Sequence, residues 1–182
     1  MLIHQVPTIK GIRVTQTKSV NDARGTFIKF HPMSGLGEPL DSVALSINPQ
    51  IGTIRGMHFQ VEPFAEEKLI TCIQGSVFDV VVDLRPNSNT FGKWTSFELS
   101  ANDTLQVYLP KGLAHGFQTL MPNSIIHYSL TSIYSPESSY AINPFGDLKI
   151  DWPLRPYSIS ERDSAGITFL EAAQRYADSL PS

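Results

Sequence analysis

Two histidines stand in sequence contexts that suit chemistry on a bound ligand. His58 lies in the run from Arg55 to Gln60, and His115 follows the turn signal at Pro110. A neutral imidazole has an ordinary pKa of about 6.5, so near neutral pH it can take a proton from a substrate. Together with a third good ligand, the same two imidazoles could instead bind a metal ion. The sequence therefore offers two chemistries, general base catalysis and metal binding.

The metal alternative lacks a third ligand. The spacing Pro110-x-Gly112-x-x-His115 resembles the second motif of cupin barrels, and metal-binding cupins add His-x-His and a Glu from a first motif. Here the matching stretch runs from His58 to Gln60, and a glutamine amide is a poor ligand. Catalytic zinc and iron sites use three good protein ligands, but only His58, His115 and an unplaced carboxylate can be assembled. We therefore predict no metal site.

Strand parity indicates which polar side chains share a face. Alternate residues of a strand point the same way, so His58 and Gln60 are expected on one face, and Gly56 leaves that face open. Asp79 stands in an otherwise apolar run, where a buried carboxylate needs a partner because burying it alone is costly. Lys68 or a histidine is the natural partner. The alternative is that Asp79 forms a structural ion pair with no part in the chemistry.

The elements that must position these residues are short β-rich runs separated by turn signals. This spacing is typical of a β-sandwich or barrel. Gln74-Gly75 predicts a tight hairpin, residues 85–89 a wider hairpin and residues 101–103 a loop. The predicted strands are Thr53–Gln60, Lys68–Ile73, Ser76–Leu84, Thr95–Leu99, Gln106–Leu109, Gly116–Leu120 and Ile125–Thr131.

Only the tail of the chain predicts a helix. Residues 169–177 place Leu170, Ala173 and Ala177 on one stripe, and we expect this helix, about residues 168–178, to pack outside the β-rich core. No linker, repeat or low-complexity tract divides the chain. The sequence therefore predicts one all-β domain over residues 1–182 with a short C-terminal helix.

Composition narrows the class of protein. Of the 182 residues 41% are apolar, and the formal net charge is −3, which gives no basic field for nucleic acid or an anionic membrane. No apolar stretch approaches the roughly 20 residues of a membrane helix. The single cysteine, Cys72, cannot form an intrachain disulfide, and residues 1–7 lack the pattern of a signal peptide. We expect a cytoplasmic protein without nucleic-acid or membrane partners.

Nine short motifs carry a resemblance to a known family. They are Asp22–Phe27, Ile54–Gln60, Lys68–Ile70, Val77–Arg85, Thr90–Trp94, Gly112–Phe117, Tyr134–Pro136, Ile150–Pro153 and Ser160–Asp163. In order and spacing, from about residue 22 to residue 164, they resemble the dTDP-4-dehydrorhamnose 3,5-epimerase family. The resemblance implies a cupin-type jelly-roll barrel with its β-rich catalytic core at about residues 22–164. It also implies a homodimer with exchanged strands.

The resemblance implies a reaction and a catalytic set. The family inverts carbons beside the C4 ketone of a nucleotide-linked 4-keto-6-deoxyhexose, which needs a base, a stabiliser of charge on the carbonyl oxygen and an acid. By resemblance His58 is the base, Asp163 is the carboxylate that pairs with it, and Tyr128 is the acid. Lys68 matches the lysine beside the carbonyl oxygen. No cofactor is implied, and the expected partner is a nucleotide-diphosphate keto-sugar.

The resemblance also implies a substrate-binding set. Arginine side chains suit a pyrophosphate because their forked donors match its oxygens. Arg24 and Arg162 have the alternative of surface ion pairs, and Arg162 fills a position where the family often has lysine. His115 has the alternative of a core histidine, and Tyr128 that of simple barrel packing. The predicted set is Arg24, Phe27, Lys29, Arg55, Gln60, Asp79, His115 and Arg162.

Departures from the family pattern fall at recognition positions. Lys29 stands where the family commonly has a glutamate, and the run Val43–Leu45 replaces a Gln-x-Asn contact pair. Ser139 replaces a glutamate, and Ile133 stands where an aromatic side chain often lies near the base. Because the proton-transfer residues are kept, we hypothesise an active epimerase whose sugar, nucleotide or set of inverted carbons differs from that of the rhamnose enzyme.

Two other functions fit the same residues. The protein could invert a single carbon of a different nucleotide-linked keto-sugar. It could also be a homologue that binds a sugar nucleotide without turnover, a reading motivated by the changed recognition residues. Uptake of solvent deuterium into the sugar distinguishes a catalyst from a binder, and the labelled positions distinguish the two kinds of epimerase.

Overall fold

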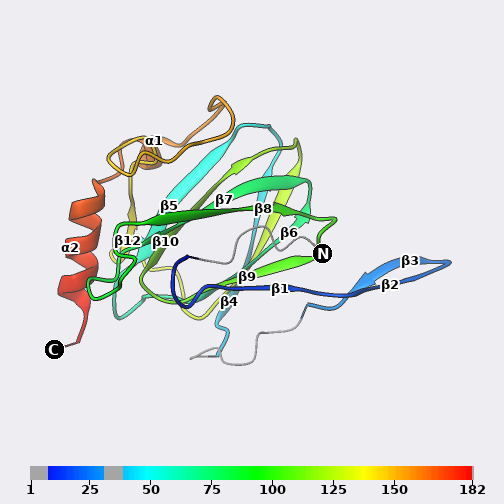
Figure 1. Ribbon diagram of the computed structural model, residues 1–182, viewed down its shortest axis with the longest axis horizontal. Helices are drawn as coiled ribbons and strands as arrows, with labels where there is room; N and C mark the ends of the chain where they lie inside the picture. Colours follow the sequence, from blue (N-terminus) through cyan, green and yellow to red (C-terminus); the bar gives the residue numbers. More distant parts are fainter. Residues whose placement is uncertain (1–7, 31–38, 182) are drawn as a thin grey trace.

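Two five-stranded antiparallel sheets face each other and form the body of the protein (Figure 1). The structure is a computed structural model that describes residues 8–30 and 39–181. The elements are β1 (Arg13–Gln16), β2 (Ser19–Asp22), β3 (Gly25–Ile28), β4 (Ser42–Asn48), β5 (Ile54–Gln60), β6 (Lys68–Gln74), β7 (Ser76–Asp83), β8 (Trp94–Ser100), β9 (Leu105–Leu109), β10 (Leu113–Thr119), β11 (Ser124–Leu130), β12 (Ser139–Ala141), α1 (Glu161–Ser164) and α2 (Phe169–Ser179). One sheet has the order β1-β9-β6-β11-β4 and the other the order β12-β5-β10-β7-β8. This is the all-β, cupin-type jelly roll that the sequence predicts.

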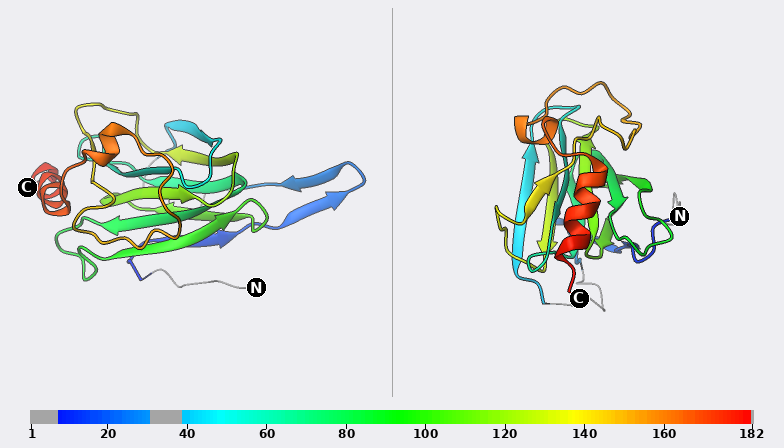
Figure 2. Two further views of the ribbon diagram at one scale, coloured as in Figure 1. Left: turned by 90° about the horizontal axis from the view of Figure 1, so that it is seen from above. Right: turned by 90° about the vertical axis from the view of Figure 1, so that its left-hand side faces the viewer.

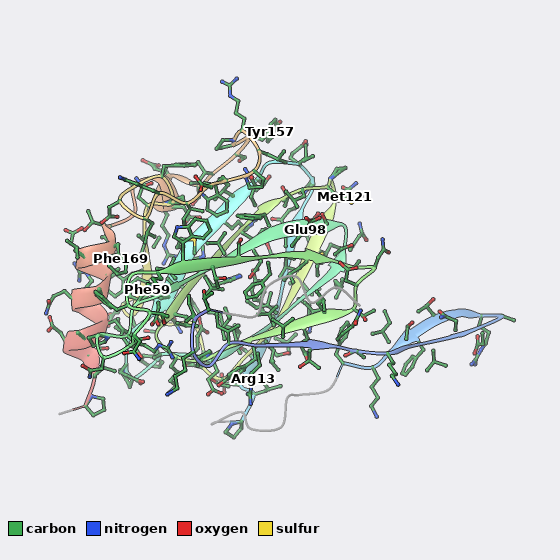
Figure 3. The ribbon with its side chains drawn as sticks, viewed as in Figure 1. Arg13, Phe59, Glu98, Met121, Tyr157 and Phe169 are labelled. Atoms are coloured by element: carbon green, nitrogen blue, oxygen red, sulfur yellow. The ribbon has the colours of Figure 1, made fainter. Side chains whose placement is uncertain are left out.

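The second sheet is buried on both faces. Its inner face packs against the first sheet, where Val81 of β7 and Phe117 of β10 join one apolar core. On its outer face Val80 meets a second core that contains Phe59 of β5 and Phe169 of α2, whose side chains Figure 3 labels. Neighbouring β7 valines therefore serve different cores, which explains the nearly unbroken apolar sequence of this strand.

All seven predicted strands are present, but one predicted connection is wrong. Residues 85–89 do join the antiparallel pair β7 and β8, as predicted. The hairpin predicted at Gln74-Gly75 does not form, because β6 pairs with β9 and β11 while β7 pairs with β8 and β10. Gly75 instead carries the chain from one sheet to the other with a φ of +73°, and a Cβ there would lie 2.4 Å from Ser124 Oγ. A local turn signal does not say which strands pair.

The predicted C-terminal helix is α2. Its start is fixed by a capping box between Thr168 and Glu171. The stripe predicted for it is wrong in part, because the helix buries Phe169, Ala172, Ala173 and Tyr176, while Leu170 is exposed. Within residues 8–30 and 39–181, no helix is long and apolar enough to cross a membrane.

The chain before β5 forms strands that the sequence analysis did not predict. Strand β4 lies at one edge of the first sheet and pairs with β11, and β1 lies at the other edge and pairs with β9. Strands β2 and β3 pair only with each other and project from the body as a two-stranded arm (Figure 2). Residues 1–7, from which the lack of a signal peptide was inferred, lie outside the described residues.

Candidate active site

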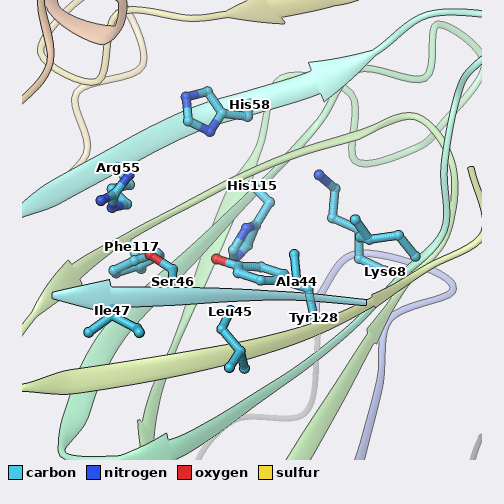
Figure 4. A pocket seen from close by; sticks show the side chains of 11 residues that line it. Ala44, Leu45, Ser46, Ile47, Arg55, His58, Lys68, His115, Phe117 and Tyr128 are labelled. Carbon is cyan, nitrogen blue, oxygen red and sulfur yellow. The ribbon is translucent and has the colours of Figure 1, made fainter. Parts of the chain in front are cut away.

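A cavity of about 310 Å³ lies between the two sheets. Polar side chains enter it from both sides: Arg55 and His58 from β5, His115 from β10, Lys68 from β6 and Tyr128 from β11 (Figure 4). The jelly roll thus gathers these five side chains from four strands. The complete lining is Ala44, Leu45, Ser46, Ile47, Arg55, His58, Lys68, His115, Phe117, Tyr128 and Leu130.

Two glycines allow β5 and β10 to place their histidines side by side. His58 and His115 are direct partners in the antiparallel register. Gly56 has a φ of +117°, and a Cβ on it would lie 2.5 Å from the Cα of Gly116. A side chain at Gly56 would therefore push β5 away from β10, because a contact this short cannot be relieved against backbone atoms. This close approach is what brings the two imidazoles to one end of the cavity.

His58 is oriented by a buried carboxylate. Its Nε2 lies 2.7 Å from Asp163 Oδ1, while the backbone N–H of Gly56 donates to Asp163 Oδ2 over 3.0 Å. Burial alone would raise the pKa of Asp163, but the hydrogen bonds that its carboxylate accepts from His58, Gly56 and Ser160 outweigh burial and hold this pKa below its usual value. Asp163 is therefore ionised near neutral pH and can only accept hydrogen bonds.

The charge on Asp163 fixes the proton on the imidazole. Because the carboxylate accepts at Nε2, that nitrogen carries the hydrogen, and the lone pair of the neutral ring is on Nδ1. The His58 side chain is 38% exposed, so a ligand in the cavity can reach it. This arrangement has the geometry of a general base held by an orienting carboxylate.

A second histidine–carboxylate pair lies beside the first. His115 Nε2 is 2.6 Å from Asp79 Oδ2, and both side chains are buried. The partner of Asp79 is thus a histidine, as one of the two sequence alternatives predicted. Asp79 Oδ1 has no hydrogen-bond partner among the described residues. Asp79 itself lies behind the lining, so it influences the cavity through His115.

Tyr128 faces the histidines from the opposite sheet. Its ring meets that of His115 edge-on, with centroids 5.8 Å apart and an interplanar angle of 75°. Burial, reinforced by the nearby Asp79 carboxylate, raises the pKa of Tyr128 well above its usual value, and Arg55 opposes this only in part. The phenol therefore keeps its proton at neutral pH and can act as a donor.

Lys68 supplies a positive charge to the same cavity. Its Nζ lies 2.8 Å from Glu66 Oε1, and both side chains are largely buried. An unpaired buried ammonium is costly, so Glu66 balances and orients the lysine. The sequence analysis missed Glu66, although it stands two residues before Lys68.

Gln60 lies outside the cavity lining. Its Nε2 donates to the carbonyls of Phe64 and Ile133, and its Oε1 accepts from the N–H of Ser135. The buried amide therefore braces the two loops that follow β5 and β11. In the described chain Gln60 supports the site from behind and does not face a ligand in the cavity.

Arg162 also lies outside the lining, next in sequence to Asp163. It is exposed, and it donates to Ser139 Oγ over 2.8 Å and to Tyr134 Oη over 3.3 Å. Two of the departures noted in the sequence are therefore near this arginine. Ser139 accepts a hydrogen bond from Arg162, and Ile133 directly precedes its other partner, Tyr134. None of these residues is part of the cavity lining.

Three predicted substrate-binding residues are remote from the cavity. Arg24 and Phe27 belong to the β2–β3 arm, and Lys29 follows it directly (Figure 2). Arg24 is exposed and pairs with Asp22 at 2.6 Å, which matches its surface ion-pair alternative within one chain. Phe27 is 66% exposed.

Strand β4 contributes residues that the sequence analysis did not assign. Ala44 and Ser46 point into the cavity, whereas the side chains of Leu45 and Ile47 point to the other side of the strand (Figure 4). Leu45, which the sequence analysis interpreted as the replacement of a family contact residue, is 54% exposed on that outer side. Phe117 could have been found from parity, because it stands two residues after His115. Ser46 gave no such signal, since its strand was not predicted.

The two imidazoles of the cavity are engaged by carboxylates, each by its own. Among the described residues no group of three or more histidine, cysteine, aspartate or glutamate side chains is placed to hold a metal ion.

Comparisons with known proteins agree on one family. The model of the family described as dTDP-4-dehydrorhamnose 3,5-epimerase matches residues 7–171. An enzyme of that name from Shigella flexneri is 40% identical over 171 residues, which cover 90% of this chain and 94% of the relative. A dTDP-6-deoxy-D-glucose-3,5-epimerase from Legionella pneumophila, solved with dTDP-4-keto-L-rhamnose, has a TM-score of 0.87 at 32% identity and covers 96% of this chain and 95% of its own. A 3'-monoepimerase from Streptomyces bikiniensis, solved with dTDP-quinovose, has a TM-score of 0.85 at 29% identity. The match covers 97% of this chain and 91% of the monoepimerase.

Proposed function

Because the chain belongs to the dTDP-4-dehydrorhamnose 3,5-epimerase family, we propose that it is an isomerase that inverts C3, C5 or both in a dTDP-4-keto-6-deoxyhexose. The observation that carries the proposal is the His58–Asp163 pair, which faces Tyr128 across one cavity. A base on one sheet and an acid on the other can address opposite faces of a sugar ring held between them. Inversion of a carbon requires this opposed placement.

The first step of the proposed reaction removes a proton beside the ketone. Nδ1 of His58 accepts the proton, the electrons of the C–H bond form a C=C bond, and the C4 carbonyl becomes an enolate. Asp163 stabilises the resulting imidazolium through Nε2. The Lys68 ammonium holds the negative charge on the enolate oxygen, a contribution of about 10²- to 10³-fold in rate at comparable sites.

The second step returns a proton from the other face of the ring. Tyr128 donates its phenolic proton to the same carbon, the C=C electrons form the new C–H bond, and the ketone is restored. Solvent then takes the proton from His58 and reprotonates Tyr128. The sugar is neither oxidised nor reduced, so the step consumes no redox cofactor. Arg55, at the edge of the cavity, is the proposed partner of the diphosphate.

Replacing Asp163 with asparagine tests the proposed pair. The N–H of Gly56 fixes an oxygen at its side of residue 163, so the new amide NH₂ faces His58 Nε2. That nitrogen then accepts, the ring hydrogen moves to Nδ1, and the base is lost. We expect Asp163→Asn to lower kcat about 10²-fold with little change in KM. A kcat within twofold of the wild type, measured from the rate of epimerised product, would contradict the proposed tautomer.

We also propose a homodimer in which the β2–β3 arm of one copy reaches the other copy. An isolated two-stranded hairpin is marginal in water, yet this arm projects from the body with Phe27 exposed. On the outer side of β4 the exposed side chains of Val43, Leu45 and Ile47 form an apolar row along a sheet edge. A second copy that covers both features would bring Arg24, Phe27 and Lys29 to a cavity.

Subunit mixing tests this dimer. Arm variant Phe27→Ala and cavity variant His58→Ala are each expected to be weakly active. A mixed dimer contains one copy with an intact cavity that receives an intact arm from the other, so mixing after partial unfolding should restore activity severalfold. Sedimentation should give twice the mass of the chain. A monomer, or mixtures no more active than the sum of the separate variants, would contradict the arm exchange.

Product analysis tests the function itself. Incubation with dTDP-4-keto-6-deoxyglucose should yield an epimerised sugar, identified by its proton coupling constants, and the UDP-, GDP- and CDP-linked sugars should react more slowly. A protein that epimerises only a sugar linked to another nucleotide would contradict the dTDP assignment. Activity that survives treatment with a chelator is expected from the proton-transfer scheme.

We propose the cytoplasm as the compartment, which the buried free thiol of Cys72 supports.

A further inference from the structure

Asn48, at the end of β4, is a buried amide with every hydrogen-bonding position engaged. Its Nδ2 donates to the carbonyls of Ser46 and Ser124 over 3.0 and 3.2 Å. Its Oδ1 accepts from Ser46 Oγ over 3.3 Å and from Arg55 Nε over 2.8 Å. The residue is 1% exposed. Because two carbonyls fix the amide nitrogen, the orientation of the amide is determined and its oxygen must face Arg55.

The bond from Arg55 to Asn48 joins the two sheets. Asn48 and Ser124 belong to β4 and β11 of the first sheet, whereas Arg55 belongs to β5 of the second. Arg55 is itself exposed, and an exposed arginine samples many rotamers unless a partner holds it. The contact with Asn48 removes most of this freedom at the edge of the cavity.

The contact also selects the edge of the guanidinium that remains available. With Nε committed to Asn48 Oδ1, a bidentate partner can engage Arg55 only through its two terminal nitrogens. A diphosphate presents pairs of oxygens that match such a fork. Asn48 lies on the inner side of β4, two residues after Ser46, which points into the cavity.

We infer that Asn48 is a positioning residue that holds Arg55 in place for the diphosphate of the substrate. The inference rests on the proposed function, because it takes the diphosphate of a nucleotide sugar as the group that Arg55 meets. Asn48 does not line the cavity and acts through Arg55. Loss of the Asn48 side chain should therefore weaken nucleotide binding and leave the proton-transfer residues in place.

A double-mutant cycle with dTDP as the probe tests the inference. Asn48→Ala should raise the Kd of dTDP about tenfold, and raise KM similarly, while kcat stays within about threefold. Arg55→Ala should raise the same Kd at least as much. In the Arg55→Ala background, adding Asn48→Ala should change the Kd less than about twofold, because the arginine through which Asn48 acts is gone.

Gln118→Ala is the matched control. Gln118 is a fully buried amide on β10, the strand paired with β5; its side chain donates to and accepts from the backbone of Leu154 and, among the described residues, makes no hydrogen bond with Arg55 or Asn48. This variant should lose thermal stability to a degree comparable with Asn48→Ala but keep the wild-type Kd for dTDP. If both variants raise the Kd equally, the effect of Asn48 is general destabilisation and the inference is wrong.

The remaining outcomes separate the inference from the proposed function. Equal effects of Asn48→Ala in the wild-type and Arg55→Ala backgrounds would overturn the inference, as would an unchanged Kd. A wild-type protein that binds dTDP but inverts no sugar would contradict the function, and the binding cycle would still decide the role of Asn48. A wild-type protein that does not bind dTDP would overturn both.

Discussion

Replacing His58 with alanine should lower the rate of proton removal from the substrate about 10³-fold, within the usual range for loss of a general base. His58 Nδ1 is the lone pair that the Asp163 contact leaves available in the cavity. The Lys68 ammonium is paired with Glu66 and has no lone pair to accept a proton, and the His115 side chain is only 5% exposed, against 38% for His58, so neither is placed to replace it. The effect is measured as loss of the sugar C–H signals in D₂O, followed by proton NMR.

Binding provides the control for this variant. Because the diphosphate partner Arg55 is untouched, the Kd of dTDP should stay within about threefold of the wild type. His58→Gln is a second variant that keeps a hydrogen-bond donor near the position of His58 Nε2 for Asp163 and still lacks a base, so it separates the loss of the base from the exposure of a buried carboxylate. Deuterium exchange near the wild-type rate in either variant would exclude His58 as the base.

Replacing Tyr128 with phenylalanine should separate exchange from inversion. Without the phenol the enolate still forms on the His58 face and can recover a solvent-derived proton from the same imidazole. The sugar C–H should therefore exchange with D₂O within about tenfold of the wild-type rate, while epimerised product should fall about 10³-fold. Both quantities come from one NMR time course, since exchange removes a signal and inversion changes the coupling constants.

Tyr157→Phe is the matched control for this substitution. Tyr157 is exposed on a loop outside the cavity, where Figure 3 labels it, so losing its hydroxyl should change neither quantity. If Tyr128→Phe reduced exchange and inversion in parallel, the tyrosine would be needed for proton removal and its role as the acid would be wrong. Unchanged inversion would place the acid elsewhere.

Local pattern was enough to predict seven of the ten strands that form the two sheets of the described chain. The runs from Thr53 to Thr131 have the β-branched content and turn punctuation of strands, and each is present in the structure. Pairing was not predictable in the same way. The signal at Gln74-Gly75 is that of a hairpin, but β6 pairs with β9 and β11 in one sheet, whereas β7 pairs with β8 and β10 in the other.

Strand β4 was missed although its sequence alternates. Val43, Leu45 and Ile47 alternate with Ser42, Ala44 and Ser46, the pattern of a half-buried strand. In the structure Val43, Leu45 and Ile47 are exposed on the outer side of the strand, whereas the small residues Ala44 and Ser46 face the cavity. The usual rule of apolar residues inside is reversed here because the interior holds a ligand site and, in the proposed dimer, the exterior meets a second copy.

The candidate site, like the fold, could be predicted only in part from the sequence. Parity and the family resemblance predicted His58, Lys68, His115, Tyr128 and Arg55, and the structure brings these five to one cavity. Asn48 and Glu66 were not predictable, because each acts through a partner that only the folded chain brings within reach.

Several expectations stay predictions. They are the catalytic and binding roles assigned to individual residues, the reaction without a cofactor, the single domain over residues 1–182 and the cytoplasmic location. The hypothesis that the departures alter specificity also stays a prediction. In the described chain Leu45 belongs to the lining with its side chain pointing outward, Lys29 follows the arm, and Ile133 and Ser139 are not part of the lining.

Proton NMR of dTDP-4-keto-6-deoxyglucose in D₂O is the measurement that tests the central claim most directly. The account predicts that the wild-type protein removes the C3–H signal, the C5–H signal or both, and that His58→Ala does not. Rapid loss of both signals with full inversion would refute only the hypothesis of altered specificity. Retention of both signals, with this sugar and with its CDP-, GDP- and UDP-linked counterparts, would contradict proton abstraction by this site and leave a protein that binds without turnover.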